Sequence, residues 1–160
     1  MRIGHGYDVH RFGSGNAVRL GGVTIPHSRG VIAHSDGDVL LHALMDALLG
    51  AAALGDIGLL FPPTDARHAG ADSRALLREV VGRVAAAGFA VENCDLTLVA
   101  EVPRIGAHRD TILATVAADI GIARDRVNLK ATTAEGLGAI GRSEGLAAHA
   151  VVLLRETHVT

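Results

Sequence analysis

Asp8 and His10, near the start of the chain, and His42, further along it, are the residues whose types and spacing most clearly suggest chemistry. Asp8 and His10 are two positions apart, so an extended strand places both side chains on the same face. A helix packed over that strand could bring His42 to the same point. Two imidazoles and one carboxylate are suitable zinc ligands, and they leave the fourth position of a tetrahedral ion open. The set therefore predicts a catalytic zinc site that can bind a substrate oxygen.

The composition favours small-molecule chemistry. With 160 residues the chain is long enough for one domain with a full core, so we expect a single domain over residues 1–160. The net charge of −2 gives no electrostatic reason to expect nucleic acid or an anionic membrane as partner. The longest apolar stretches are shorter than the ~20 residues of a membrane span. A single cysteine and an N-terminus without signal-peptide features lead us to expect a cytoplasmic protein.

Hydrophobic periodicity predicts a mixture of strands and helices. The predicted strands cover residues 3–11, 18–25, 90–100, 127–131 and 146–154, and the predicted helices cover residues 36–53, 73–87 and 103–120. The loop at 13–16 has hairpin composition, which favours antiparallel pairing of the first two strands. Two prolines make 59–65 a loop, and three glycines do the same for 136–141. This order predicts an α+β sandwich in which one mixed sheet is covered by helices.

The start of the first predicted helix carries both structural and functional signals. Ser35 stands three residues before Asp38, which is a variant of the capping box with aspartate in place of glutamate. Asp38, His42 and Asp46 are spaced by four, so they share one face of the helix, and this polar stripe should face a site. Asp46 is interpreted equally well as a carboxylate that is solvated or supports the ligands and as a substrate contact. Backbone amides at this helix start also favour anions.

Several longer motifs resemble those of the 2-C-methyl-D-erythritol 2,4-cyclodiphosphate synthase family, and they occur along the chain in the same order as in that family. They are residues 7–12, 20–26, 34–42, 55–58, 61–62, 130–135 and 141–145. The resemblance covers residues 2–154, and the stretch 35–62 is far more specific than any short pattern. It implies a homotrimer around a central axis that acts in the non-mevalonate isoprenoid pathway. The implied reaction is that of a phosphorus-oxygen lyase, which cyclises 4-diphosphocytidyl-2-C-methyl-D-erythritol 2-phosphate and releases CMP.

The resemblance also implies roles for individual residues. It assigns zinc to Asp8, His10 and His42, and a second divalent ion, magnesium or manganese, to Glu135. His34 and Thr133 would stabilise charge on phosphate oxygens, and no protein nucleophile is required. The implied substrate contacts are Asp8, His10, His34, Ser35, Asp56, Ile57, Gly58, Phe61, Asp65, Ala100, Arg104, Ile105, Gly106, Ala131, Thr132, Thr133, Glu135 and Arg142. In the family the cytidine pocket, here 100–106 and 131–133, is completed across a subunit interface.

The chain departs from the family's pattern at three places. Pro63 stands where an aspartate is common, and Arg104-Ile105-Gly106 replaces a lysine and larger apolar residues. In the family the arginine matching Arg142 lines a cavity on the trimer axis that is associated with isoprenoid diphosphates. Ala139 takes the place of the aromatic residue that usually accompanies that arginine. The axial ligand is therefore the implied partner most affected by these departures.

Alternatives remain open. Taken without the family, Asp56 between two glycines makes a turn, Glu135 is a surface residue and Thr132-Thr133 ends a strand. Six histidines lack a partner at suitable spacing and are interpreted as structural or surface groups, namely His5, His27, His68, His108, His149 and His158. A zinc-dependent phosphohydrolase would hold hydroxide at the open metal position. A trimeric binding protein for nucleotides or isoprenoid diphosphates would use the metal only to order the site.

Overall fold

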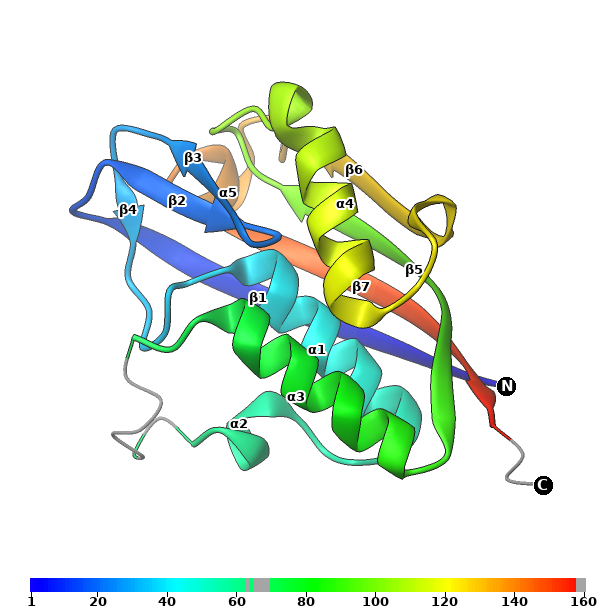
Figure 1. Cartoon of the computed structure of the whole chain (residues 1–160). Coiled ribbons are helices and arrows are strands. Elements are labelled where there is room, and N and C mark those ends of the chain that lie inside the picture. The colour runs from blue at the N-terminus through cyan, green and yellow to red at the C-terminus, as the bar shows by residue number, and fades with distance from the viewer. Residues whose placement is uncertain (63, 65–69, 158–160) are drawn as a thin grey trace.

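The computed structural model describes residues 1–62, 64 and 70–157, and it consists of a five-stranded sheet with helices packed on one face (Figure 1). The strands are β1 (Arg2–Gly13), β2 (Ala17–Leu20), β3 (Val23–Pro26), β4 (Gly30–Val31), β5 (Phe89–Val99), β6 (Val127–Thr132) and β7 (Gly145–Glu156). The helices are α1 (Val39–Ala52), α2 (Ile57–Leu60), α3 (Ser73–Ala86), α4 (Arg109–Ile120) and α5 (Gly138–Gly141), with short 3-10 turns η2 (Gly106–His108) and η3 (Arg124–Arg126). Within the described ranges, none of the helices has the length and apolar character needed to cross a membrane.

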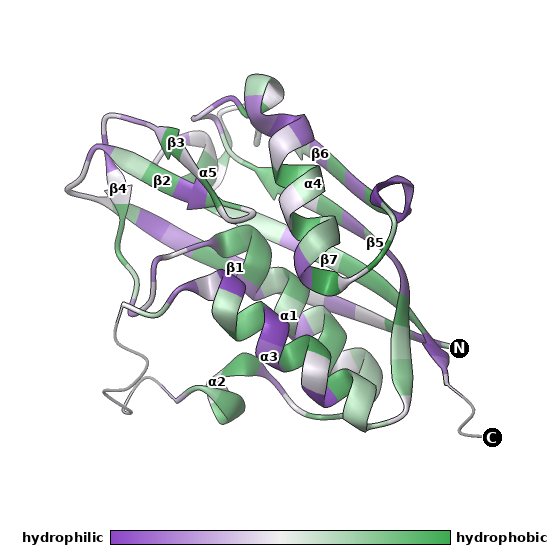
Figure 2. Cartoon of the chain, viewed as in Figure 1, coloured by the Kyte–Doolittle hydropathy of each residue, from purple (hydrophilic) through white to green (hydrophobic). Residues whose placement is uncertain are grey.

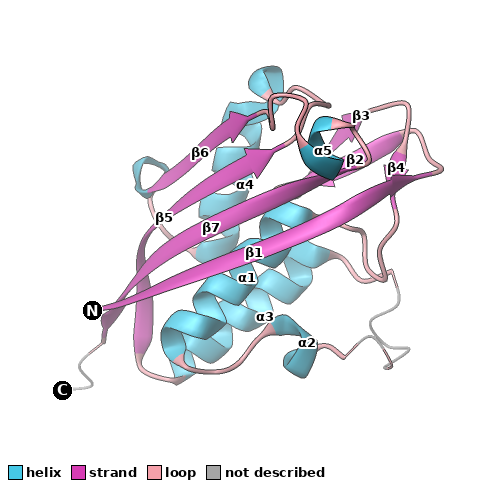
Figure 3. Ribbon diagram, turned by 180° about the vertical axis from the view of Figure 1, so that it is seen from behind, coloured by secondary structure: helices cyan, strands magenta, loops and turns pink. Residues whose placement is uncertain are grey.

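The main sheet is mixed, with the strand order β4-β1-β7-β5-β6. β5 and β6 run parallel, and the other neighbours run antiparallel. α1, α3 and α4 all lie behind the sheet in Figure 3, so they cover one of its faces. The predicted α+β architecture with one mixed sheet and helices is therefore confirmed.

The predicted hairpin between the first two strands is wrong. β1 pairs with β7 over residues 2–11 and with β4, whereas residues 17–26 fold back on themselves as a separate two-stranded ribbon, β2 and β3. The reason is the turn at Gly21 and Gly22, whose φ angles of 60° and 80° suit a two-residue hairpin loop that only glycine adopts easily. Their N–H groups donate to the buried carboxylate of Asp38, at 2.9 and 2.6 Å. The ribbon is thereby attached to the start of α1.

Several element boundaries also differ from the sequence-based expectation. α1 is capped by Asp38, which accepts from Leu41 N at 3.1 Å, so the predicted capping role of Ser35 is wrong. Pro103 follows a cis peptide bond in a loop, and α4 begins only at Arg109. The one-turn helix α2 overlaps the start of the predicted loop 59–65, and the one-turn helix α5 lies within the predicted loop 136–141. The predicted helix 73–87 agrees with α3 to within two residues. The predicted strands 90–100, 127–131 and 146–154 agree equally well with β5, β6 and β7.

α1 lies directly against β1, and this contact depends on glycine. Every residue of α1 except Asp46 and Gly50 is buried, and the helix is apolar on nearly all sides because it lies between the sheet and α3 (Figure 2). A Cβ atom on Gly4 would lie 2.0 Å from the carbonyl oxygen of Ala47, and one on Gly6 would lie 1.9 Å from that of Ala43. Because neither residue has a side chain, the two backbones touch. The same face of β1 carries Asp8 and His10.

The opposite face of β1 and β7 is apolar and exposed. Ile3, Tyr7 and Val9 of β1 are 74%, 49% and 47% exposed, and Val151 of β7 is 39% exposed. Val151 stands directly opposite His5 in the β1–β7 register, so these side chains emerge on one side of the sheet. We call these four residues the open sheet face. Exposed apolar side chains grouped on one sheet face, here beside His5 and His149, are typical of a protein–protein contact.

Candidate active site

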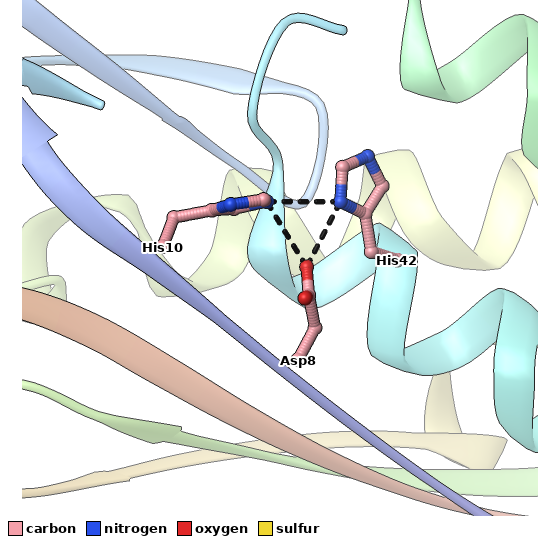
Figure 4. Close-up of side chains that lie close together, drawn as sticks. All are labelled: Asp8, His10 and His42. Carbon is pink, nitrogen blue, oxygen red and sulfur yellow. Dashed lines mark hydrogen bonds and ion pairs between the residues drawn. The ribbon is translucent and has the colours of Figure 1, made fainter. Parts of the chain in front are cut away.

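Asp8, His10 and His42 converge as the sequence predicts (Figure 4). Oδ2 of Asp8 lies 3.0 Å from Nε2 of His10 and 2.9 Å from Nδ1 of His42, and the two ring nitrogens are 3.0 Å apart. The three ligand atoms thus form a nearly equilateral triangle. Two imidazole nitrogens and one carboxylate oxygen are a donor set that would hold a zinc ion. Among the described residues this is the one group of three or more histidine, cysteine or acidic side chains that could hold a metal.

The neighbouring charges favour ionised Asp8 and protonated His42 when no cation is present. Burial works to raise the pKa of Asp8, but hydrogen bonds with His10 and His42 outweigh it and hold that pKa far below 3.8. Burial likewise works to lower the pKa of His42, yet the hydrogen bond and charge of Asp8, with the charges of Asp38 and Asp36, raise it above 6.5. The site therefore attracts positive charge, and a divalent ion would replace the proton on His42.

The second ring nitrogen of His42 faces two hydroxyl groups. Nε2 lies 3.0 Å from Oγ of Ser35 and 3.1 Å from Oγ of Ser73. Ser73 is fully buried, and its sequence context did not indicate a site because serine is common at the start of a helix. Asp72 in fact accepts the capping bond from Arg74 N.

Most of the predicted phosphate-side contacts surround the three ligand residues. They line one cavity of about 230 Å³, formed by Asp8, His10, Ala33, His34, Ser35, His42, Met45, Ile57, Gly58, Phe61 and Leu76. Asp56 caps α2 by accepting from Leu59 N at 2.8 Å, which places Ile57 and Gly58 at the cavity wall. Asp46 accepts from Ile57 N at 2.9 Å, so it joins α1 to α2. The predicted contact Asp65 and the departure Pro63 lie outside the described residues.

The predicted cytidine segments form a second cavity, which shares no lining residue with the first. It has a volume of about 630 Å³ and includes Ala100, Glu101, Arg104, Ile105, Gly106, Arg109, Lys130, Ala131, Thr132 and Thr133 in its lining. It lies where the parallel strands β5 and β6 end. One chain therefore presents the predicted metal half and the predicted nucleotide half of the site as two separate cavities.

The loop that carries Glu135 is held next to the second cavity. Glu101 accepts from the backbone N–H groups of Ala134 and Gly136, at 2.9 and 3.4 Å, a role that the sequence did not reveal. Oγ1 of Thr133 donates to Oε1 of Glu135 at 2.9 Å, and Glu135 has a positive φ of 52°. The Glu135 carboxylate is exposed, so it is accessible to an ion or a ligand.

The remaining predicted residues lie elsewhere. Arg142 lines neither cavity and pairs with Glu144 at 2.7 Å. His5 and His149 touch each other, with their ring nitrogens 3.2 Å apart, a contact that their spacing in the sequence does not indicate. His27 stacks on Phe12, which is a structural role. His68 and His158 lie outside the described residues.

Comparison with known proteins agrees with this geometry. Residues 1–155 match the YgbB family. A 2-C-methyl-D-erythritol 2,4-cyclodiphosphate synthase of Pseudomonas aeruginosa (strain UCBPP-PA14) is 64% identical over 154 residues, which are 96% of this chain and 98% of that protein. A solved 2C-methyl-D-erythritol-2,4-cyclodiphosphate synthase in its CDP-bound form is 44% identical with a TM-score of 0.89, over 96% of this chain and 100% of that chain. An IspF–CDP complex of Plasmodium falciparum is 32% identical with a TM-score of 0.86, over 98% of this chain and 97% of that chain. The chain therefore belongs to the YgbB family, and its resemblance to the 2-C-methyl-D-erythritol 2,4-cyclodiphosphate synthase family is confirmed.

Proposed function

We propose that the chain catalyses the cyclisation carried out by these synthases. An oxygen of the 2-phosphate of 4-diphosphocytidyl-2-C-methyl-D-erythritol 2-phosphate attacks the β-phosphorus. The bond from that phosphorus to the oxygen bridging the α-phosphate breaks, and CMP leaves with the electron pair, as in a phosphorus-oxygen lyase. The observation that carries this proposal is the convergence of Asp8, His10 and His42 in a cavity lined by His34, Ser35 and Ile57-Gly58.

In this proposal Asp8, His10 and His42 hold zinc. A bound zinc ion would polarise a phosphate oxygen of the substrate. His34 and Ser35, at the same cavity, are placed to donate hydrogen bonds to phosphate oxygens as charge develops on them. Because nucleophile and electrophile belong to one molecule, the chain's main task is to fold the substrate back on itself. Well-oriented reactions of this kind reach effective molarities of ~10⁵ M or more.

The nucleotide end of the substrate is proposed to bind in the second cavity. Residues of the segments 100–106 and 131–133 line a space of about 630 Å³, and Arg104 adds a positive charge to its lining. Two relatives of known structure carry CDP, which is the cytidine diphosphate part of the proposed substrate. Thr133 would contact the diphosphate, and Glu135 beside it would hold the second divalent ion, magnesium or manganese, since hard carboxylate oxygens suit these ions.

We also propose a homotrimer around a central axis, with active sites between subunits. Two features support it. The open sheet face would be buried by further copies of the chain. The two halves of the proposed site lie in separate cavities of one chain, and a neighbouring subunit would complete each of them. Arg142 would then line the axial cavity, where an isoprenoid diphosphate is the proposed ligand.

Product analysis tests the proposed reaction. The purified protein is incubated with the cytidylylated substrate, zinc and magnesium in water enriched in ¹⁸O. We expect CMP and a cyclic diphosphate without solvent oxygen. A linear diphosphate that contains ¹⁸O would instead indicate the phosphohydrolase, since hydrolysis takes its nucleophile from water. Tight binding without any turnover would indicate the binding protein.

Replacing Glu135 with glutamine is expected to retain zinc and lose most of the activity. The amide keeps the shape of the side chain but removes the charge that holds the second ion, so high magnesium or manganese should restore part of the rate. Zinc content and the dependence of rate on magnesium are measured side by side, with Glu156→Gln on β7 as the matched control. Loss of zinc in the Glu135→Gln protein would contradict the assignment of the two ions.

A further inference from the structure

The least obvious part of the site is a buried chain of contacts behind His42. Its Nε2 atom lies 3.1 Å from Oγ of Ser73, and that hydroxyl in turn donates to the carboxylate of Asp36. We propose that Ser73, oriented by Asp36, is a positioning residue that fixes His42 in the tautomer whose Nδ1 is free to bind a metal. The proposal rests on the metal-binding part of the proposed function.

Asp36 determines which way the Ser73 hydroxyl points. Its two carboxylate oxygens are approached only by donors among the described residues. Oδ1 accepts from the hydroxyl of Ser73 and from Asp38 N at 3.3 Å, and Oδ2 accepts from Ser73 N at 3.1 Å. Arg19 adds an ion pair, with Nε 3.5 Å from Oδ2. A carboxylate surrounded in this way acts as an acceptor, so the hydroxyl proton of Ser73 must be directed at it.

The direction of that proton fixes the role of Ser73 toward His42. With its hydroxyl hydrogen given to Asp36, Ser73 offers His42 a lone pair and accepts the Nε2–H. A neutral imidazole has one N–H, so placing it on Nε2 leaves the lone pair of Nδ1 free. Nδ1 is the atom that lies 2.9 Å from Asp8 and 3.0 Å from His10. The buried contact therefore selects the form of the ring that a metal requires.

Ser35 touches the same nitrogen but is suited to a different task. Its Oγ lies 3.0 Å from Nε2 of His42 and accepts from Gly37 N at 3.3 Å. Its hydroxyl hydrogen is not required by either contact, and Ser35 lines the metal cavity, so it is available to donate to a phosphate oxygen. Ser73 is fully buried and lines no such cavity, so it acts through His42 alone. Ser35 is thus suited to bind substrate, and Ser73 is suited to orient the metal ligand His42.

Zinc affinity and tautomer state test the proposal without any substrate. Ser73→Ala removes the fixed acceptor, and we expect its zinc affinity, measured by chelator competition, to fall by about 10- to 100-fold, as is usual when an outer-shell partner is removed. Ser35→Ala is the matched control, since it removes the other hydroxyl at the same nitrogen. It should change zinc affinity by less than about threefold while raising KM. Ser73→Thr, which keeps the hydroxyl, should recover most of the affinity.

A second measurement reads the hydrogen bond directly. In the zinc-loaded protein, ¹H–¹⁵N correlation spectra should show a slowly exchanging proton on Nε2 of His42, and this proton should exchange faster with solvent in Ser73→Ala than in Ser35→Ala. Unchanged zinc affinity in a folded Ser73→Ala protein, or equal exchange of this proton in the two variants, would overturn the proposal. A protein that passes both tests and yet forms no cyclic product would overturn the proposed reaction and leave the role of Ser73 standing.

Discussion

His42→Ala is expected to lose most of its zinc while its fold stays largely intact. The substitution removes one of three ligands, and no fourth protein ligand lies near the triangle within the described residues. Removing even an outer-shell partner costs 10- to 100-fold in metal affinity, so losing a direct ligand should cost at least about 100-fold, with a corresponding loss of activity. Elemental analysis after dialysis measures the zinc retained by wild type and variant.

The neighbours of His42 explain why the fold should survive. The apolar residues around it on α1 are fully buried and are not altered by the substitution. His108→Ala is a suitable control, because His108 lines neither cavity. Circular dichroism compares the folds of all three proteins. If His42→Ala and wild type hold equal zinc, the ligand assignment is wrong.

Mixing two inactive variants is expected to restore activity if the active site is shared between subunits. His42→Ala damages the metal half of the site, and Thr133→Val damages the nucleotide half by removing the hydroxyl that contacts Glu135. In a trimer with cyclic symmetry, each site pairs the metal half of one subunit with the nucleotide half of the next. After random exchange of equal amounts, about one quarter of the sites combine two undamaged halves, and neither parent has any.

The mixture should therefore show about a quarter of wild-type activity. Mass spectrometry under native conditions verifies that subunits have exchanged, and unmixed parents assayed at the same total concentration supply the baseline. A monomeric mass at working concentration would refute the shared site. Verified mixed trimers without recovered activity would refute it as well.

The metal ligands could be predicted from the sequence because their arrangement follows from local rules. Asp8 and His10 are two residues apart on a strand, and the apolar pattern of residues 39–52 requires a helix that packs against it. The pairing of β1 could not be predicted in the same way. Its partner β7 begins at Gly145, and a strand does not encode which distant segment lies beside it. A turn at Gly21-Gly22 instead of 13–16 was enough to change the topology.

The outer parts of the site also combine features that the sequence predicts with features that it does not. The segments 100–106 and 130–135 were predicted from the resemblance to a family, and the structure places residues of 100–106 and 130–133 in one cavity at the ends of β5 and β6. Ser73 and Glu101 were missed because their contacts join segments far apart in the sequence. Ser73 contacts Asp36, and Glu101 contacts the backbone after Thr133. Polar side chains of this kind have no periodicity, so only the folded chain reveals them.

The glycine contact between β1 and α1 also affects the rate at which the site binds a metal ion. Since the backbone of Gly4 and Gly6 rests against that of α1, the distance between the backbones that carry Asp8 and His42 is set by direct contact. The triangle of donor atoms is complete before any ion arrives. The rate of metal uptake should then be limited by loss of water from the ion and of the proton from His42, with no rearrangement of the chain.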